Sequence, residues 1–370
     1  MSVVDYFEKP AFPKISFPYL PLSDLFGNQL VGDSYDVAII GVKSDSDSIN
    51  KGCAAAPDEI RKYLYSLRGG LKRLRVADLG NIRCGNDSVE ASFALRDVVA
   101  ELRAARVIPV VIGGSQDLTV AVYDGLKENS AELNLTVLDS RLDLSVEEMA
   151  PVTPYSYLNT ILHDEKRFRV DVVGSQSYYY SESQQALLQG NDCWDLRLGK
   201  LRVDLSEAEP IFRDSDLVSV DMAVVRQSDA PGNEMPSPNG LAGEELCQLV
   251  HYAGLSDRVQ AFCLFEVNPY FDNNGQTASL SAQVIWHFLE ALSNRYGDYP
   301  VRDISTYKKV VVTEMDSNDA VVFYNNHLNN RWWMEIPMNQ GRKIFSCSYQ
   351  DYCKAKSGHL SDLWMRYYRR

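Results

Sequence analysis

From about residue 36, short runs rich in β-branched residues alternate with amphipathic stretches of helical spacing. DVAIIGV is followed by PDEIRKYLYSL, and RVIPVVIGG lies between SFALRDVVAELRAA and LTVAVYDGLKE. This alternation is typical of parallel strands, because the crossover between two parallel strands is usually a helix that packs on the sheet. The pattern predicts a three-layer αβα fold with a mostly parallel sheet.

The alternation continues through LNLTVLDS, RVDVVGS, DLVSVDMAVV and VQAFCLFEVNP and closes with the long amphipathic stretch TASLSAQVIWHFLEALSNRY. It stops after residue 300, where KKVVVTEM, AVVFYNN and RWWMEIP are typical of a small antiparallel unit and YQDYCKAKSGHLSDLWMRYYRR is expected to be partly helical. We therefore predict an N-terminal arm at 1–35, an α/β domain at 36–298 and a C-terminal appendage at 299–370 packed on it.

Charge and composition exclude several function classes. The formal net charge of −13 argues against a nucleic-acid-binding surface over the whole molecule, although residues 301–370 carry 11 Lys and Arg against 7 Asp and Glu. No apolar run is long enough to span a bilayer, so no membrane partner is expected. The N-terminus lacks the pattern of a secretory signal, and the seven cysteines form no CxxC pair, so we expect a cytoplasmic protein without a disulfide framework or zinc site.

Polar residues follow four of the predicted strands. In open α/β sheets ligands bind beyond the carboxyl ends of the strands, where this chain has GGSQD, DSRLD, DMA and FEVNPYFD. If DSRLD is extended, Asp139, Arg141 and Asp143 share one face, since side chains alternate along a strand. The simple alternative is a surface strand with a local ion pair. Asp221 and Ala223 of DMA would share a face in the same way.

The four clusters, in this order, resemble the ureohydrolase family, which includes arginase, agmatinase and formimidoylglutamase. INKGCAAAPDEIRKYL, VADLGNI, PVTPYSYLNTIL, APG, SPNGL and EVNP are similar to further segments of that family. The resemblance covers about residues 36–295 and is closest to the formimidoylglutamase branch. It implies an arginase-like fold.

By this resemblance the family hydrolyses its substrates with two manganese ions held by six side chains, and a hydroxide between the ions attacks the guanidine or formimino carbon. The positions that correspond to the six ligands in this chain are Gln116, Asp139, Arg141, Asp143, Asp221 and Ala223. Three of the six ligands, two histidines and an aspartate, are thus replaced.

The replacements affect the two ions differently. One ion would keep Asp139, Asp143 and Asp221 and gain the amide oxygen of Gln116, whereas the other would face Arg141 and Ala223. We therefore predict that the dinuclear site is lost and that the Arg141 guanidinium bridges the carboxylates in place of an ion. The prediction is that no cofactor is bound; the alternative is one divalent ion, Mn²⁺, Mg²⁺ or Ca²⁺, at the oxygen-rich site.

Glu266 in FEVNP matches the family's acidic residue that faces the substrate guanidinium, so it is the candidate for recognition of a cationic ligand. The equal alternative is a strand-end residue retained for packing or hydrogen bonding. GxGxxG, P-loop and nucleophile-elbow motifs, which would indicate another chemistry, are absent from the sequence.

Three functions remain open at the level of sequence. The favoured one is a non-catalytic binding or assembly protein; the alternative is an active hydrolase of C–N bonds in linear amidines of the formimidoylglutamate, agmatine or arginine type, with at most one metal ion. A third is a sensor that binds such a ligand without turnover. The resemblance also implies a homo-oligomer. The aromatic, basic C-terminal appendage could be a protein-partner surface, or a self-packed subdomain or protomer contact.

Overall fold

The computed structural model describes residues 6–8, 35–45, 48–67, 71, 74–83, 88–147, 150–191, 193–313, 320–339 and 341–368. Most of the predicted N-terminal arm, residues 1–5 and 9–34, lies outside the described residues.

A nine-stranded sheet forms the centre of the molecule, with the strand order β1-β3-β2-β4-β9-β8-β5-β6-β7. All neighbouring strands are parallel except β1, which pairs antiparallel with β3 at the edge. The strands are β1 (Phe7–Glu8), β2 (Val37–Gly41), β3 (Val76–Ile82), β4 (Ile108–Ile112), β5 (Leu133–Leu138), β6 (Arg167–Val173), β7 (Trp194–Leu196), β8 (Leu217–Asp221) and β9 (Ala261–Phe265).

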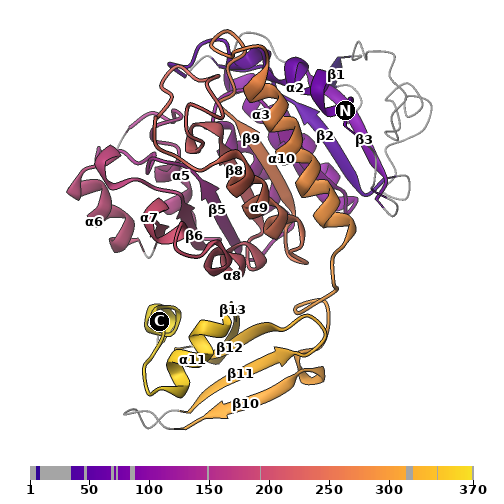
Figure 1. Ribbon diagram of the computed structural model, residues 1–370. Helices are drawn as coiled ribbons and strands as arrows, with labels where there is room; N and C mark the ends of the chain where they lie inside the picture. The colour runs from indigo at the N-terminus through magenta and orange to yellow at the C-terminus, as the bar shows by residue number, and fades with distance from the viewer. Residues whose placement is uncertain are drawn as a thin grey trace.

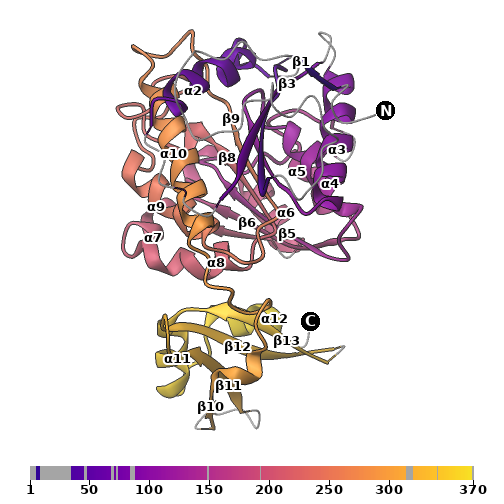
Figure 2. The ribbon, with the colours of Figure 1, turned by 90° about the vertical axis from the view of Figure 1, so that its right-hand side faces the viewer.

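Helices cover both faces of this sheet (Figures 1 and 2), and the apolar side chains between the layers are buried. One face packs against α3 (Ser88–Ala104), α4 (Leu118–Lys127), α5 (Leu158–Leu162) and α6 (Glu182–Gly190). The other packs against α2 (Ala56–Leu64), α7 (Leu198–Leu201), α8 (Glu209–Arg213), α9 (Gly243–Gly254) and α10 (Gln276–Ser293). Alternate residues of β2 show the division: Ala38 and Ile40 enter the first core, and Val37 and Ile39 enter the second. The predicted three-layer αβα fold is confirmed.

A separate antiparallel sheet follows α10, with the order β10-β11-β12-β13 (Figure 1). Its strands are β10 (Lys308–Val312), β11 (Val321–Asn326), β12 (Arg331–Met338) and β13 (Gly341–Cys347), and α11 (Tyr349–Lys356) and α12 (Asp362–Tyr367) complete the appendage. Side chains of α11 and α12 pack against Phe323, Trp332 and Phe345 on one face of the sheet. The predicted small β-rich and helical appendage is therefore present; the boundaries of the three units stay predictions.

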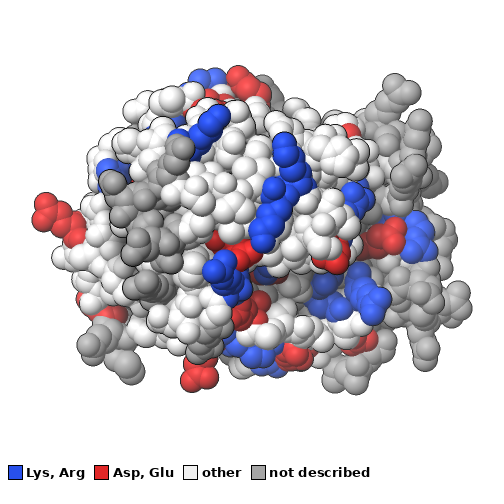
Figure 3. All heavy atoms as spheres, turned by 90° about the horizontal axis from the view of Figure 1, so that it is seen from below, with Lys and Arg blue, Asp and Glu red and all other residues white. Residues whose placement is uncertain are grey.

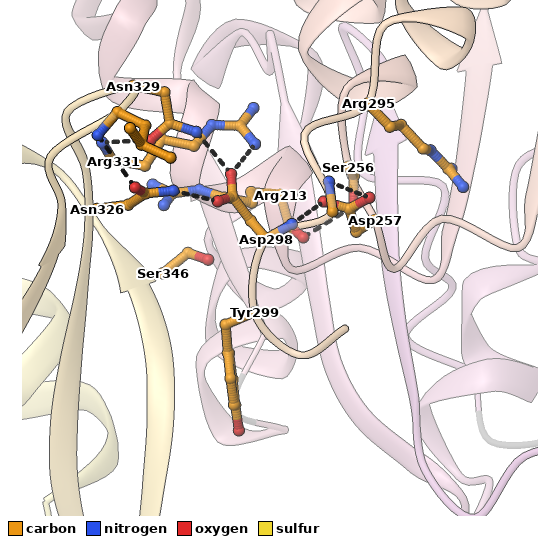
Figure 4. Close-up of polar contacts among 12 residues, drawn as sticks. Arg213, Ser256, Asp257, Arg295, Asp298, Tyr299, Asn326, Asn329, Arg331 and Ser346 are labelled. Atoms are coloured by element: carbon orange, nitrogen blue, oxygen red, sulfur yellow. Dashed lines mark hydrogen bonds and ion pairs between the residues drawn. The ribbon is translucent and has the colours of Figure 1, made fainter. Parts of the chain in front are cut away.

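Buried charges join the appendage to the α/β domain (Figure 4). The Asp298 carboxylate accepts hydrogen bonds from Tyr307, Asn326, Asn329 and Arg331, at 2.6 to 3.0 Å. These four donors belong to the appendage, whereas the Asp298 backbone N–H donates to Asp257 of the α/β domain, at 2.7 Å. Because Asp298 is buried, an ionised carboxylate without these donors would be costly.

A second set of contacts runs from the α/β domain to the appendage backbone. The Arg213 guanidinium donates to the carbonyl oxygens of Trp332 and Cys347, and Asp214 accepts from the N–H and hydroxyl of Ser346. Arg213 ends α8 and Asp214 follows it, shortly before the start of β8, so the appendage lies at the end of the sheet where parallel strands begin. A ligand site at the carboxyl ends of the strands is at the opposite edge.

The surface seen from below displays Lys and Arg side chains with carboxylates between them (Figure 3). Arg342 pairs with Glu335 within the appendage, and Lys343 of the appendage pairs with Glu132 of the α/β domain. Among the helices in the described part of the chain, none is both long enough and apolar enough to cross a bilayer.

Candidate metal and active site

Four neighbouring strands carry the candidate residues. β4, β9, β8 and β5 are adjacent in the sheet and parallel, so their carboxyl ends lie side by side. Gln116 follows β4, Glu266 follows β9, Asp221 ends β8, and Asp139 follows β5. Residues that are up to 150 positions apart in the sequence are thus brought to one edge of the sheet, as the strand-end argument predicts.

Asp139, Asp143 and Asp221 form a compact carboxylate cluster. One oxygen of each lies within 4.8 Å of the others, and all three side chains are buried. Asp139 and Asp221 are oriented by the turns that follow their strands: Asp139 Oδ1 accepts from the N–H of Arg141 at 2.9 Å, and Asp221 Oδ1 accepts from the N–H of Ala223 at 2.6 Å. In the described parts of the chain this is the one group of three or more His, Cys, Asp and Glu residues arranged to hold a metal ion.

The negative charge of the cluster is poorly compensated. Burial raises the pKa of Asp143 well above its usual range, and the neighbouring charge of Asp139 adds to the shift. Burial also raises the pKa of Asp221, again with the charge of Asp139, and the pKa of Asp139 itself is raised by burial despite the hydrogen bonds that it accepts. Across the described residues, no ion pair joins any of the three aspartates to a Lys, Arg or His. The cluster is therefore suited to binding a cation.

The turn after β4 places Gln116 at the same edge. Gly113 and Gly114 have φ of +81° and +79°, a conformation that glycine adopts readily. The Gln116 amide Nε2 lies 3.2 Å from both the Tyr157 hydroxyl and Ser219 Oγ, and donates to each. Gln116 Oε1 is buried and accepts no hydrogen bond from the described residues. Since both amide hydrogens are used, the oxygen is the free ligand atom.

The residues present fit one hard divalent cation. Magnesium, calcium and manganese prefer carboxylate and amide oxygens; the cluster offers three carboxylates, and the Gln116 amide follows β4 at the same edge of the sheet. Two buried oxygens, Gln116 Oε1 and Asp139 Oδ2, lack a hydrogen-bond partner in the described structure, and a cation would satisfy both.

Glu266 is held in a strained and fully bonded position. Its φ is +61°, a left-handed conformation that is unusual for a residue with a side chain. Glu266 Oε1 accepts from the N–H of Gln116, and Oε2 accepts from Asn50 Nδ2, both at 2.9 Å. Burial raises the pKa of this carboxyl to about 7. The hydrogen bonds agree with a residue retained at the strand end for packing or hydrogen bonding. Backbone strain, in contrast, is typical of functional sites, so recognition of a cationic ligand by Glu266 stays a prediction.

Arg141 does not lie where the sequence suggested. The chain turns after Leu138 instead of continuing as a strand, and the Arg141 guanidinium lies over the Tyr179 ring, 4.4 Å from the ring centroid. It forms no ion pair with Asp139, Asp143 or Asp221. The aspartates converge as expected, but the arginine bridge between them does not form.

Several residues that hold the site were not singled out in the sequence. Tyr157 and Ser219 bind the Gln116 amide, and Asn50 binds Glu266. Ser219 carried a detectable signal, because it is a polar residue within the apolar strand LVSVD, where a buried hydroxyl needs a partner.

Curated relatives that match this chain include formimidoylglutamases. That of Halobacterium salinarum is 28% identical over 293 residues, which cover 72% of this chain and 88% of the relative. That of Lysinibacillus sphaericus is 27% identical over 301 residues, covering 77% of this chain and 89% of the relative.

Solved structures share the fold. A variant of formiminoglutamase from Trypanosoma cruzi, solved with Mn²⁺, superposes with a TM-score of 0.67 at 21% identity, covering 74% of this chain and 98% of that one. Formimidoylglutamase from Bacillus subtilis gives a TM-score of 0.65 at 20% identity, covering 80% and 93%.

Two sequence-based expectations are overturned. The preference for a non-catalytic protein is wrong, because the relatives that match over most of their length are named as formimidoylglutamases, which are hydrolases. The expectation of no cofactor is wrong as well: Asp139, Asp143 and Asp221 are gathered as a group that can hold a metal ion, and a structure of the same fold contains Mn²⁺.

The family assignment rests on the α/β domain. The model of the arginase family matches residues 35–290, which is more than half of the chain and contains all the strand-end residues described above. The match agrees with the strand order, the convergence of the three aspartates and the formimidoylglutamase relatives. The chain therefore belongs to the arginase family.

Proposed function

We propose that this protein is a metal-dependent hydrolase of C–N bonds in linear amidines, of the formimidoylglutamase type, and that it uses one divalent cation. The observation that carries the proposal is the buried cluster of Asp139, Asp143 and Asp221, whose carboxylates form no ion pair with the described Lys, Arg and His residues. Manganese is the preferred candidate because the T. cruzi protein of the same fold was solved with it.

A cation at the cluster would be held by the three aspartates and the Gln116 amide oxygen. When bound, such a cation lowers the pKa of water that contacts it and supplies a nucleophile near neutral pH. The surroundings favour this chemistry, since the three carboxylates are buried and the Tyr157 and Ser219 contacts fix the Gln116 amide.

The substrate amidine is a planar cation, and the acidic edge of the sheet suits it. Glu266 lies at the neighbouring strand end, with a carboxylate position fixed by Asn50 and the Gln116 N–H. We assign to Glu266 the recognition of the amidinium group. In the reaction, the oxygen of water adds to the amidine carbon, the bond from that carbon to the substituted nitrogen breaks, and this nitrogen leaves with a proton as the free amine. For formimidoylglutamate the products are formamide and glutamate.

The proposal is tested by measuring product release from three amidines. Chelator-treated protein is supplied with Mn²⁺, Mg²⁺ or Ca²⁺ and incubated with formimidoylglutamate, arginine or agmatine; formamide or urea is quantified. We expect turnover of at least one amidine that is abolished by chelation. Failure of all three amidines with all three metals, or turnover that survives chelation, would contradict the proposal.

Two variants link the activity to the cluster. Asp143→Asn removes one ligand charge at nearly constant volume, and we expect activity to fall to the chelated level because the site loses a carboxylate. Asp303→Asn is the matched control, since Asp303 is exposed and caps a short helical turn of the appendage. Circular dichroism establishes that both variants fold.

A further inference from the structure

Arg141 presents a guanidinium that pairs with no carboxylate of the described residues. Its guanidinium makes no hydrogen bond or ion pair with any described residue, and the side chain is only partly buried. A guanidinium has five N–H donors arranged to match a carboxylate, so an unpaired one beside a ligand site is suited to bind an anion.

The Arg141 side chain is nonetheless held in place. Its guanidinium lies 4.4 Å from the Tyr179 ring centroid, an interaction of cation and aromatic ring. Tyr179 is fixed in turn, because its hydroxyl donates to Ser237 Oγ at 2.7 Å. The backbone on both sides is joined as well, since the N–H of Gln176 donates to the carbonyl of Ser140 at 2.9 Å.

The site therefore has two charged ends. The buried aspartates and Glu266 form the acidic end, and Arg141, two residues from Asp139, forms the basic one. The two ends lie on one turn, because the Arg141 backbone N–H donates to Asp139 Oδ1 at 2.9 Å. A ligand that reaches from one end to the other needs a cationic amidine and an anionic group.

We propose that Arg141 binds the carboxylate of the substrate and that the site therefore selects amidines that carry a carboxylate over amidines that carry only positive charge. The inference rests on the proposed function for the amidine end but not for the carboxylate end. In this arrangement the Arg141 guanidinium lies over the Tyr179 ring and does not pair with the aspartates, so its N–H donors are available to a ligand carboxylate.

The first test uses a ligand that needs no turnover. Binding of L-glutamate to Mn²⁺-supplemented protein is measured by calorimetry for the wild type, Arg141→Met and Arg141→Lys. We expect Arg141→Met to weaken binding by about 10- to 100-fold through loss of a charge-assisted pair, and Arg141→Lys to be intermediate because it keeps the charge without the fork. Arg302→Met is the matched control, since Arg302 is exposed on the appendage. Unchanged glutamate affinity in Arg141→Met would overturn the inference.

The second test compares two amidines. Arginine and agmatine differ only in the carboxylate, so wild-type protein should bind arginine more tightly, and Arg141→Met should lose this preference while its affinity for agmatine is retained. Tyr179→Leu should weaken glutamate binding severalfold, because the guanidinium is no longer held. An arginine preference that persists in Arg141→Met would contradict the assignment.

The outcomes separate the two proposals. If glutamate binding depends on Arg141 but no amidine is hydrolysed, the carboxylate site stands and the proposed hydrolase function fails. If hydrolysis depends on the metal but glutamate binding and KM are unaffected by Arg141→Met, the carboxylate assignment alone fails.

Discussion

The position of the Glu266 carboxylate is fixed by hydrogen bonds from neighbouring residues. Both carboxylate oxygens face N–H donors, and Asn50 cannot reverse its amide freely, because Asn50 Oδ1 accepts from the N–H of Glu234 and from Asn268. The positive φ of Glu266 is sustained by these contacts. The carboxylate is thus fixed by its surroundings before any ligand arrives.

We predict that Glu266→Gln lowers stability although the two side chains have the same shape. One oxygen becomes an NH₂ group, which then faces a donor whichever way the amide is turned, and a buried unsatisfied pair of this kind costs about 1 to 3 kcal/mol. Chemical denaturation measures the free energy of unfolding. The control is Glu128→Gln at an exposed position after α4, which should be close to neutral. Equal stability of both variants would mean that the Glu266 hydrogen bonds are not formed.

Arg141 marks what the sequence could not reveal at this scale. The resemblance placed it at a ligand position, and alternation along a strand suggested that it faces the aspartates. Its real orientation depends on the end of β5 at Leu138 and on Tyr179, which belongs to a different loop. A contact between residues 38 positions apart cannot be obtained from local spacing.

At the scale of elements, the turn after β4 controls the position of Gln116. A Cβ atom on Gly113 would lie 2.5 Å from Pro57 Cδ in α2, and the positive φ adds strain for any other residue. The turn after β4 and helix α2 therefore pack too closely for a side chain at position 113, which requires glycine.

We predict that Gly113→Ala destabilises the protein by at least about 1 kcal/mol and weakens metal binding, because the turn must shift and Gln116 moves with it. Thermal unfolding and calorimetric Mn²⁺ titration measure the two effects. Gly199→Ala is the control, since a Cβ there meets nothing within 4 Å and its helix should tolerate it. Normal metal affinity in a folded Gly113→Ala protein would show that the turn does not position a ligand.

Most elements of the α/β domain were predictable because each has its own pattern, such as the apolar run VAIIG in β2 or the long amphipathic α10. β3 and β7 were not predicted as strands, and neither was β13 in the appendage. β13 begins with Gly341, Arg342 and Lys343, and these exposed or half-buried residues lack the β-branched composition that signals a strand. Its pairing with β12 depends on the hairpin and on contacts with the α/β domain.

At the scale of the whole molecule, the appendage and the candidate site lie at opposite ends of the parallel strands. Asp298 is the centre of the contacts between the two units, with four appendage donors on one carboxylate (Figure 4). The homo-oligomer and a partner surface on residues 299–370 stay predictions. The geometry implies that the appendage influences stability without shaping the ligand site.

We predict that Asp298→Ala loosens the appendage and leaves KM unchanged. Removing the carboxylate leaves the buried Arg331 with one acidic partner fewer, and breaking a buried pair costs about 3 to 5 kcal/mol. Hydrogen exchange of β11 and β12 amides should accelerate. In the control variant Asp303→Asn, the β11 and β12 amides should exchange at the wild-type rate. A changed KM would contradict the separation of appendage and site.

The same contact predicts a pH dependence. Burial alone would raise the pKa of Asp298, but hydrogen bonds from Asn329, Asn326 and Arg331 outweigh it and lower the pKa below its usual value. The stabilisation is therefore complete above the pKa of an unfolded aspartate, about 3.9, and is lost as pH falls through the lower folded value. Appendage amides followed by hydrogen exchange should lose protection only below about pH 4; loss beginning near pH 6 would contradict this assignment.

The central claim is that the cluster of Asp139, Asp143 and Asp221 binds one divalent cation. Calorimetric titration of Mn²⁺ into chelator-treated protein, compared between the wild type and Asp221→Asn, tests it most directly. We predict one ion per chain in the wild type and at least about 10-fold weaker binding in the variant. Absence of binding to the wild type, two ions per chain, or equal affinity in the variant would contradict it.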